Sequence, residues 1–426
     1  MMKNEFTKHV VTLLSGSSIA QLFPLLLYPL ITRVYTPEDL GLLALFMSIS
    51  GLLSIVFTGR YEPAIMLPDK ESDARHIFLL SLFISIFSFL VFQILFSLLA
   101  TTIATSLNSP GIHHWLYWIP IFSFVFAIFQ VLKYLLNRQK NYLGISVGNV
   151  LNSFTTGVLK VFFGLVYILP FAGLIMATII GQFAGTGWFV YRVAKVKMFL
   201  PDSFSWMELK KLAKKYIVYP KFNLFHAIAN SLSSNVPVFF FTTYFSGQVV
   251  GLYSLALGVA FRPLNLFSSS ILQVTSQKII EKYNAKLPIH HNYKQLIYFL
   301  IKWMTFPFIL IFVFAPAIFS FIFGNEWTEA GIYLRYLLPW LYMLMFVAPL
   351  SFTPEIFYKQ KKAMIIDLIY LALRFLSLYT GVLLNNVYLG LGLFSFSGVV
   401  VMGFNLTWYL KMTREADKKI LENHKE

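Results

Sequence analysis

The sequence predicts an all-α polytopic membrane protein with about 12 transmembrane helices. Of the 426 residues, 58% are hydrophobic and only 12% are charged, whereas soluble domains carry about 25% charged residues. Apolar runs of roughly 18 residues or more, the length that a helix needs to cross a bilayer, recur from one end of the chain to the other. A third observation is that Lys and Arg collect in alternate loops between these runs.

The apolar runs are separated by short polar segments. They cover residues 9–32, 39–59, 77–103, 112–136, 143–168, 171–191, 217–242, 249–274, 296–323, 332–353, 364–384 and 388–410. An even number of crossings places both ends of the chain on the same side of the membrane.

The basic residues give the orientation of these runs. Cytoplasmic loops of membrane proteins carry an excess of Lys and Arg, and here nearly all basic residues outside the runs lie on the side of the N-terminus. The opposite side keeps only Arg33 and Arg335. We therefore expect both termini in the cytoplasm, and we interpret the net charge of +16 as topological rather than as a sign of nucleic-acid binding.

Two internal sequence similarities indicate that the chain consists of two related halves. Residues 35–37 and 41–45 (YTP and GLLAL) loosely resemble residues 245–247 and 251–255 (FSG and GLYSL). Likewise, RQK at 138–140 resembles KQK at 359–361. Each half has six runs and starts on the same side of the membrane. The halves are therefore predicted to be two six-helix bundles related as parallel repeats, an arrangement that occurs in transporters.

A basic segment divides the halves. Ser205 and Glu208 form a capping-box pattern, and apolar residues follow at helical spacing with lysines between them, which is typical of a helix lying on the membrane surface. The predicted domains are an N-terminal bundle (1–204), this amphipathic interfacial helix (205–216), a C-terminal bundle (217–410) and a cytoplasmic tail (411–426).

Several chemistries have no sequence support. The chain has no cysteine, which excludes thiolate metal sites and disulfides. It carries neither a phosphate-binding loop nor a nucleophile elbow, and its histidine pairs lack the clustered acids of a metal site. We therefore expect a transporter without its own ATPase, no enzymatic activity, no metal and no cofactor.

Three cations lie well inside the apolar runs rather than near their ends: Lys160, Arg262 and Arg374. A charge near the bilayer centre costs at least about 2.5–3.5 kcal/mol, so it should face a watery cavity or a partner. No carboxylate lies at the middle of a run, which favours a positively charged cavity and an anionic substrate. The alternatives are that Lys160 reaches the outer surface and that Arg374 pairs with Asp367, two turns earlier.

The first and seventh runs contain prolines and polar residues at matching positions of the two halves. Such interrupted helices are typical of transporter binding sites, although small residues also serve close helix packing. His226, in the seventh run, is the only histidine well inside a run. It is either a packing residue or a proton carrier in a coupling cycle.

Four stretches carry a family resemblance. Residues 32–41 (TRVYTPEDLG) resemble the first-loop signature of Wzx-type polysaccharide (O-antigen) flippases, within the multidrug/oligosaccharidyl-lipid/polysaccharide exporter superfamily. Residues 59–65 (GRYEPAI), 137–140 (NRQK) and 250–256 (VGLYSLA) are similar to later patterns of that family. The resemblance covers nearly the whole chain.

The resemblance implies alternating access and a cationic cavity between two bundles. The expected substrate is an undecaprenyl-pyrophosphate-linked oligosaccharide, moved from the cytoplasmic to the periplasmic leaflet of a bacterial inner membrane. Membrane lipids, a polysaccharide polymerase and chain-length machinery are the expected partners. A MATE-like small-molecule exporter and a membrane glycan polymerase or glycosyltransferase remain alternatives.

Seven residues are candidates for the transport site. Arg262 and Arg374 are expected to hold the pyrophosphate, because arginine matches phosphate oxygens through two parallel hydrogen bonds, with Lys160 as the next candidate. Arg60 is expected to guard the cytoplasmic mouth beside Glu62. Since no nucleotide site is present, the direction of transport must come either from a H⁺ or Na⁺ gradient or from downstream consumption of the glycan. The candidates for coupling transport to an ion are Glu62, His226 and Asp367.

Overall fold

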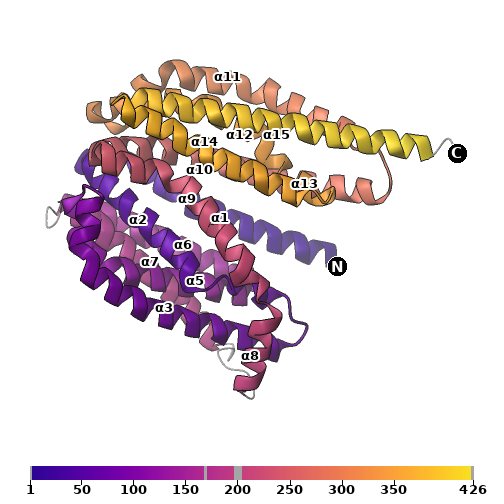
Figure 1. The fold of residues 1–426 in the computed structure, drawn as a ribbon, viewed down its shortest axis with the longest axis horizontal. Coiled ribbons are helices and arrows are strands. Elements are labelled where there is room, and N and C mark those ends of the chain that lie inside the picture. Colours follow the sequence, from indigo (N-terminus) through magenta and orange to yellow (C-terminus); the bar gives the residue numbers. More distant parts are fainter. Residues whose placement is uncertain (1, 167–169, 196–203, 424–426) are drawn as a thin grey trace. The chain divides into compact units, whose positions relative to one another are not determined.

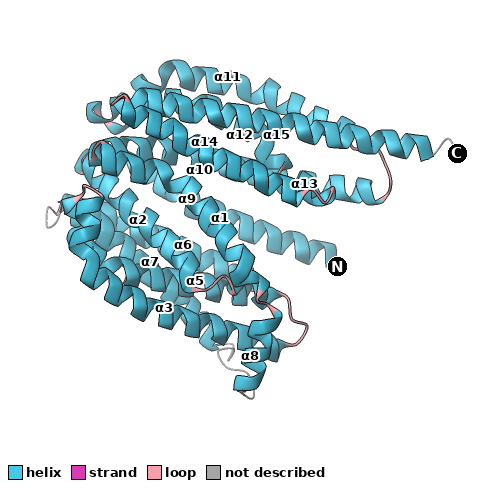
Figure 2. Cartoon of the chain, in the orientation of Figure 1, coloured by secondary structure: helices cyan, strands magenta, loops and turns pink. Residues whose placement is uncertain are grey.

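The chain is helical throughout the part that the structure describes. A computed structural model describes residues 2–166, 170–195 and 204–423, and within these ranges the regular elements are helices, with no strand (Figure 2). The predicted all-α class is confirmed.

Each predicted apolar run overlaps one long helix (Figure 1), and residues 167 and 168 of the fifth run lie outside the described residues. These helices are α1 (Met2–Val34), α2 (Pro37–Phe57), α3 (Glu71–Ser106), α5 (Trp118–Arg138), α6 (Tyr142–Leu165), α7 (Pro170–Lys195), α9 (Leu224–Tyr244), α10 (Gly247–Asn284), α11 (His290–Phe323), α12 (Thr328–Val347), α14 (Gln360–Leu383) and α15 (Val387–Asn423). Among the described residues, nine helices are long and apolar enough to cross a membrane; α1, α6 and α9 fall outside this group. The chain is thus a multi-pass membrane protein, and the count of 12 spans stays a prediction.

Short helical segments connect the long ones. They are η1 (Glu62–Met66), η2 (Pro110–Ile112), α4 (His113–Leu116), α8 (Trp206–Lys215), η3 (Tyr219–Asn223), η4 (Asn325–Trp327), η5 (Ala348–Leu350) and α13 (Thr353–Ile356). The interruption expected in the first run does not end a helix, because α1 continues through Pro24 and Pro29. The seventh run, in contrast, begins with the π-helical turn η3 before α9.

Helix α8 forms where the sequence predicts an amphipathic helix. The Ser205 hydroxyl accepts the Glu208 N–H at 3.4 Å, and Leu209 and Leu212 are buried. Trp206 stacks on Phe83 of α3, with ring centroids 5.5 Å apart. The apolar face of α8 thus packs on the protein, while its lysines remain on the other face.

The described helices form two compact units, residues 1–251 and 252–426. In the first unit, α6 packs closely on α1 and α7, and α2 contacts α9. In the second unit, α15 packs on α12 and α14, and α11 packs on α12. The domain boundaries predicted at 204 and 216 stay predictions, and the predicted tail ends at residues 424–426, which lie outside the described residues.

The start of α2 and the start of α10 touch through glycines in the first unit. A Cβ atom added to Gly251 would lie 1.6 Å from the Pro37 carbonyl oxygen, and one added to Gly41 would lie 2.0 Å from the Gly247 oxygen. Gly247 and Gly251 are four residues apart, so they share one face of α10 and allow close backbone approach. Gly41 and Gly251 are also equivalent positions in the internal sequence similarity, so the two predicted repeats meet at matching residues.

The predicted membrane topology can be tested by single cysteines, because the native chain has none. Asn108 follows α3, Asn386 precedes α15 and Ala285 follows α10. We expect Asn108→Cys and Asn386→Cys to react with an impermeant thiol reagent in intact cells, and Ala285→Cys to react only after the cells are opened. Reaction of Ala285→Cys in intact cells would contradict a cytoplasmic position of both termini.

Candidate functional site

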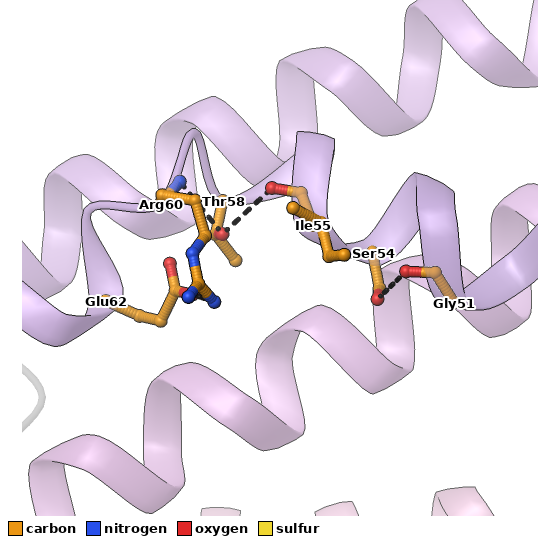
Figure 3. A network of polar contacts seen from close by, with 6 residues as sticks. All are labelled: Gly51, Ser54, Ile55, Thr58, Arg60 and Glu62. Atoms are coloured by element: carbon orange, nitrogen blue, oxygen red, sulfur yellow. Dashed lines mark hydrogen bonds and ion pairs between the residues drawn. The ribbon is translucent and has the colours of Figure 1, made fainter. Parts of the chain in front are cut away.

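The turn that follows α2 carries the first pair of candidate residues. Gly59 and Arg60 both have positive φ angles, 56° and 57°, a conformation that glycine adopts readily and other residues rarely. The Thr58 hydroxyl accepts the backbone N–H of Arg60 at 3.2 Å, which stabilises this turn (Figure 3). The reversal directs the chain into η1 and places Arg60 beside Glu62.

Arg60 and Glu62 form a partly buried ion pair. Arg60 Nη1 donates to Glu62 Oε1 at 3.2 Å, and Figure 3 shows the guanidinium beside the carboxylate. The Glu62 side chain is 5% exposed and that of Arg60 is 32% exposed. Burial raises the pKa of Glu62 above its ordinary value of 4.5, and hydrogen bonding and the charge of Arg60 oppose this rise in part. Glu62 is therefore a carboxylate that can exchange a proton closer to neutral pH than an exposed one.

Neighbouring helices hold this pair in place. The Tyr61 hydroxyl donates to the Ala213 carbonyl of α8 at 3.0 Å. Arg138, at the end of α5, donates to Glu71 at 2.9 Å and to the Ile65 carbonyl of η1 at 3.1 Å. The stretches GRYEPAI and NRQK, which are far apart in sequence, therefore meet at the same end of the first unit.

A pH experiment tests the burial of Glu62. Because its folded-state pKa is raised, the folded protein binds the proton before the unfolded chain does. Stability should therefore rise as the pH falls from 7 through the raised pKa, and the gain should be complete below the ordinary value of 4.5. Glu62→Gln should lack this gain in stability at low pH, whereas Glu38→Gln, at an exposed position, should keep it. Thermal unfolding of the purified protein between pH 7 and 4.5 measures the gain. Identical pH profiles for Glu62→Gln and the wild type would contradict this account.

Lys160 and Arg60 lie at opposite ends of α2. The Lys160 carbonyl on α6 accepts the Tyr35 hydroxyl at 2.9 Å, and Tyr35 lies just before α2, whereas Arg60 lies just after it. A helix of 21 residues is about 32 Å long. The structure therefore does not bring these two candidate cations together.

Polar contacts cross between α2 and α9 in mid-span. The Ser48 hydroxyl donates to Asn235 Oδ1 at 2.7 Å, and Asn235 Nδ2 donates to the Ser231 carbonyl at 2.8 Å. His226 lies nine residues before Asn235 on α9, and its side chain is exposed. Since α2 and α9 run in opposite directions, His226 lies near the level where α2 ends, which is the end that carries Arg60.

In the second unit, Arg374 lies in a cage of aromatic rings. Its guanidinium carbon is 4.0 Å from the ring centre of Tyr370, 4.9 Å from that of Phe394 and 5.1 Å from that of Trp340. Arg374 Nη2 also donates to the Tyr370 hydroxyl at 2.8 Å. Desolvated cation–π contacts of this kind are worth about 2 kcal/mol. Arg374 itself is only 7% exposed.

Two further residues give the cage its shape. A Cβ atom added to Gly398 would lie 2.3 Å from Trp340 Cδ1, so only glycine leaves room for the ring. The Ser395 hydroxyl accepts the backbone N–H of Trp340 at 3.2 Å. Sequence reasoning missed these residues and the cage, because the chain contains 45 Phe and 23 Tyr, which hide the few rings that surround a cation.

The other candidates of the second unit differ from Arg374 in exposure. Arg262 on α10 is partly exposed, and Asp367, two turns before Arg374 on α14, is exposed. Of the two arginines, Arg262 is thus the more exposed. Within the described ranges no group of three or more acidic or histidine side chains could hold a metal ion.

The sequence matches the model of the family described as Polysaccharide biosynthesis protein over residues 30–331. The chain belongs to this family. Among curated protein sequences, none matches the chain significantly. The matched range includes the first-loop signature, the Arg60–Glu62 turn and Arg262, so the predicted family relationship is confirmed.

Solved structures share the fold of this family member. An inward-facing MATE family multidrug resistance transporter of the MOP superfamily matches with a TM-score of 0.71 and 14% identity, covering 93% of this chain and 96% of that one. The lipid II flippase MurJ, in an inward closed conformation, matches with a TM-score of 0.72 and 13% identity, covering 96% of this chain and 91% of that one. At such identities the similarity establishes the fold.

Proposed function

We propose that this polysaccharide biosynthesis family member is a flippase for an undecaprenyl-pyrophosphate-linked oligosaccharide repeat unit, such as that of O-antigen. The observation that carries the proposal is the family match over residues 30–331. The fold shared with MurJ, a flippase for lipid II, is consistent with transport of a lipid-linked substrate. The proposed location is a bacterial inner membrane.

The charged residues fit an anionic lipid-linked substrate. The cations Lys160, Arg262 and Arg374 lie inside long helices, and the buried carboxylate Glu62 is already paired with Arg60. We assign Arg262 the main contact with the pyrophosphate, because it is partly exposed and arginine can bind phosphate oxygens in pairs. Arg374 could join this contact only if its aromatic cage opens.

Arg60 and Glu62 form the proposed inner gate. A substrate pyrophosphate would compete with Glu62 for the Arg60 guanidinium, and protonation of Glu62 would weaken the ion pair and free Arg60. The raised pKa of Glu62 brings this protonation closer to neutral pH. Glu62 is therefore the first candidate for H⁺ coupling, with His226 and Asp367 as the others. Alternatively, transport is driven in one direction because a polymerase and its chain-length machinery consume the glycan.

The fold alone does not separate this function from drug export, since a MATE transporter matches as well as MurJ. A buried acid without a basic partner would favour binding of a cationic drug, whereas the buried Glu62 is paired with Arg60. A membrane glycan polymerase is the second rival.

Removal of the protein from cells tests the proposal against both rivals. We expect the complete lipid-linked repeat unit to accumulate in the cytoplasmic leaflet. Accumulation in the outer leaflet would instead indicate a polymerase, and unchanged glycan export with lost drug resistance would indicate a drug exporter.

A further inference from the structure

A groove in the second unit is lined by basic side chains that the proposed transport site does not use. It lies where the N-terminal end of α11 meets the last turns of α15, and its volume is about 780 Å³. Lys294 reaches it from α11, and Lys411, Arg414 and Lys418 reach it from α15. These four cations are exposed.

The groove has a clear excess of positive charge. Lys411, Arg414 and Lys418 are spaced by three and four residues, so they share one face of α15. The acidic side chain in the lining is Glu415, which lies 4.0 Å from Lys411. Since both members of that pair are exposed, their attraction is weak, and Lys411 remains available to an anion.

Hydrogen bonds fix the two walls of the groove to each other. Asp417 on α15 accepts the Ile289 N–H at 2.8 Å and the His290 N–H at 2.9 Å. His290 Nδ1 lies 2.9 Å from the Thr413 hydroxyl. Asp417 is therefore engaged by the start of α11, and the cations of both helices are held around one opening.

Exposed side chains on α11 give the depth of the groove relative to a bilayer. Tyr298 and Trp303 are 68% and 59% exposed, and exposed apolar residues continue from there to Phe321. Exposed Tyr and Trp typically mark the membrane interface. Lys294 lies four residues before Tyr298, about 6 Å further from the apolar region, which is the level of lipid headgroups.

We propose that this groove binds the phosphate headgroup of an anionic phospholipid in the leaflet on the side of the C-terminus. Positive side chains near a membrane surface attract anionic headgroups, and Leu410 in the lining offers an apolar contact for the carbon atoms beneath the phosphate. The inference does not depend on the flippase proposal, because it concerns a bulk membrane lipid. A polyprenyl pyrophosphate carries the same phosphate chemistry, so the test must separate the two.

Native mass spectrometry of the purified full chain, titrated with phosphatidylglycerol or phosphatidylcholine, provides the test. We expect preferential binding of phosphatidylglycerol. The variant Lys411→Gln/Arg414→Gln/Lys418→Gln should bind it about a hundredfold more weakly, and Lys294→Gln, which changes the other wall, should weaken it several-fold. The matched control Lys278→Gln/Lys359→Gln/Lys361→Gln loses the same charge at exposed positions outside the groove and should bind like the wild type.

Two results would overturn the proposal. Equal losses in the groove variant and the control would show that binding follows net charge rather than this groove. Displacement of phosphatidylglycerol by a lower concentration of undecaprenyl pyrophosphate, in the wild type but not in the groove variant, would assign the groove to the polyprenyl substrate.

Discussion

Replacing Gly251 with alanine is expected to destabilise the protein, although alanine normally favours a helix by about 1 kcal/mol over glycine. The added Cβ would lie 1.6 Å from the Pro37 carbonyl oxygen, a backbone atom that cannot rotate away. The starts of α2 and α10 must then separate, at a cost of about 1–3 kcal/mol. This predicts a melting temperature lower by about 2–4 °C for each kcal/mol, measured by thermal unfolding of the purified protein.

The chain offers a matched control for this substitution. Gly51, which lies in α2, has open space where its Cβ would be. Gly51→Ala should therefore leave the melting temperature unchanged or raise it. If Gly251→Ala is as stable as Gly51→Ala, the close glycine contact between the predicted repeats does not exist in the protein.

Arg262→Glu is expected to abolish glycan export while the protein still reaches the membrane at wild-type levels. A carboxylate at this position would repel the pyrophosphate. Arg262→Lys keeps the charge but loses the paired hydrogen bonds, so we expect export to fall by about tenfold. Arg262→Ala should fall between these two variants. Normal export by correctly inserted Arg262→Glu would exclude a phosphate-binding role for Arg262.

Arg374 should respond differently, because it is buried among rings. Arg374→Gln removes the cation from its cage, and we expect a loss of about 2 kcal/mol in stability together with lower membrane levels. Gly398→Ala, which would push against Trp340, should have a similar effect without changing any charge. If Arg374→Gln is fully stable but inactive, the arginine contacts substrate instead, and the cage must open during transport.

Hydropathy alone predicted the positions of the long helices, because each apolar run must satisfy its backbone hydrogen bonds within a helix. The capping of α2 was visible only in part. The sequence places a polar segment between the runs that end at residue 32 and begin at residue 39, and the structure adds that Thr36 and Asp39 cap the helix reciprocally.

Contacts between distant parts of the chain could not be predicted from one sequence. Arg60 and Glu62 are close in sequence, so their pairing was foreseeable, but the burial of Glu62 depends on α3, α5 and α8 packing around the turn. The cage of Arg374 depends on rings from α12, α14 and α15, and no local pattern reports how these helices meet. The spacing of Gly247 and Gly251 was readable, yet its partner Gly41 lies some two hundred residues away.

Reconstituted vesicles test the central claim most directly. The complete undecaprenyl-pyrophosphate-linked oligosaccharide is placed in the inner leaflet of vesicles, and an enzyme that cleaves the glycan is added outside. With the wild-type protein we expect the glycan to become cleavable over time, and with Arg262→Glu we expect the low rate of protein-free vesicles. A wild-type rate equal to that of protein-free vesicles, with an imposed H⁺ or Na⁺ gradient in either direction, would contradict the proposal that this protein is a lipid-linked oligosaccharide flippase.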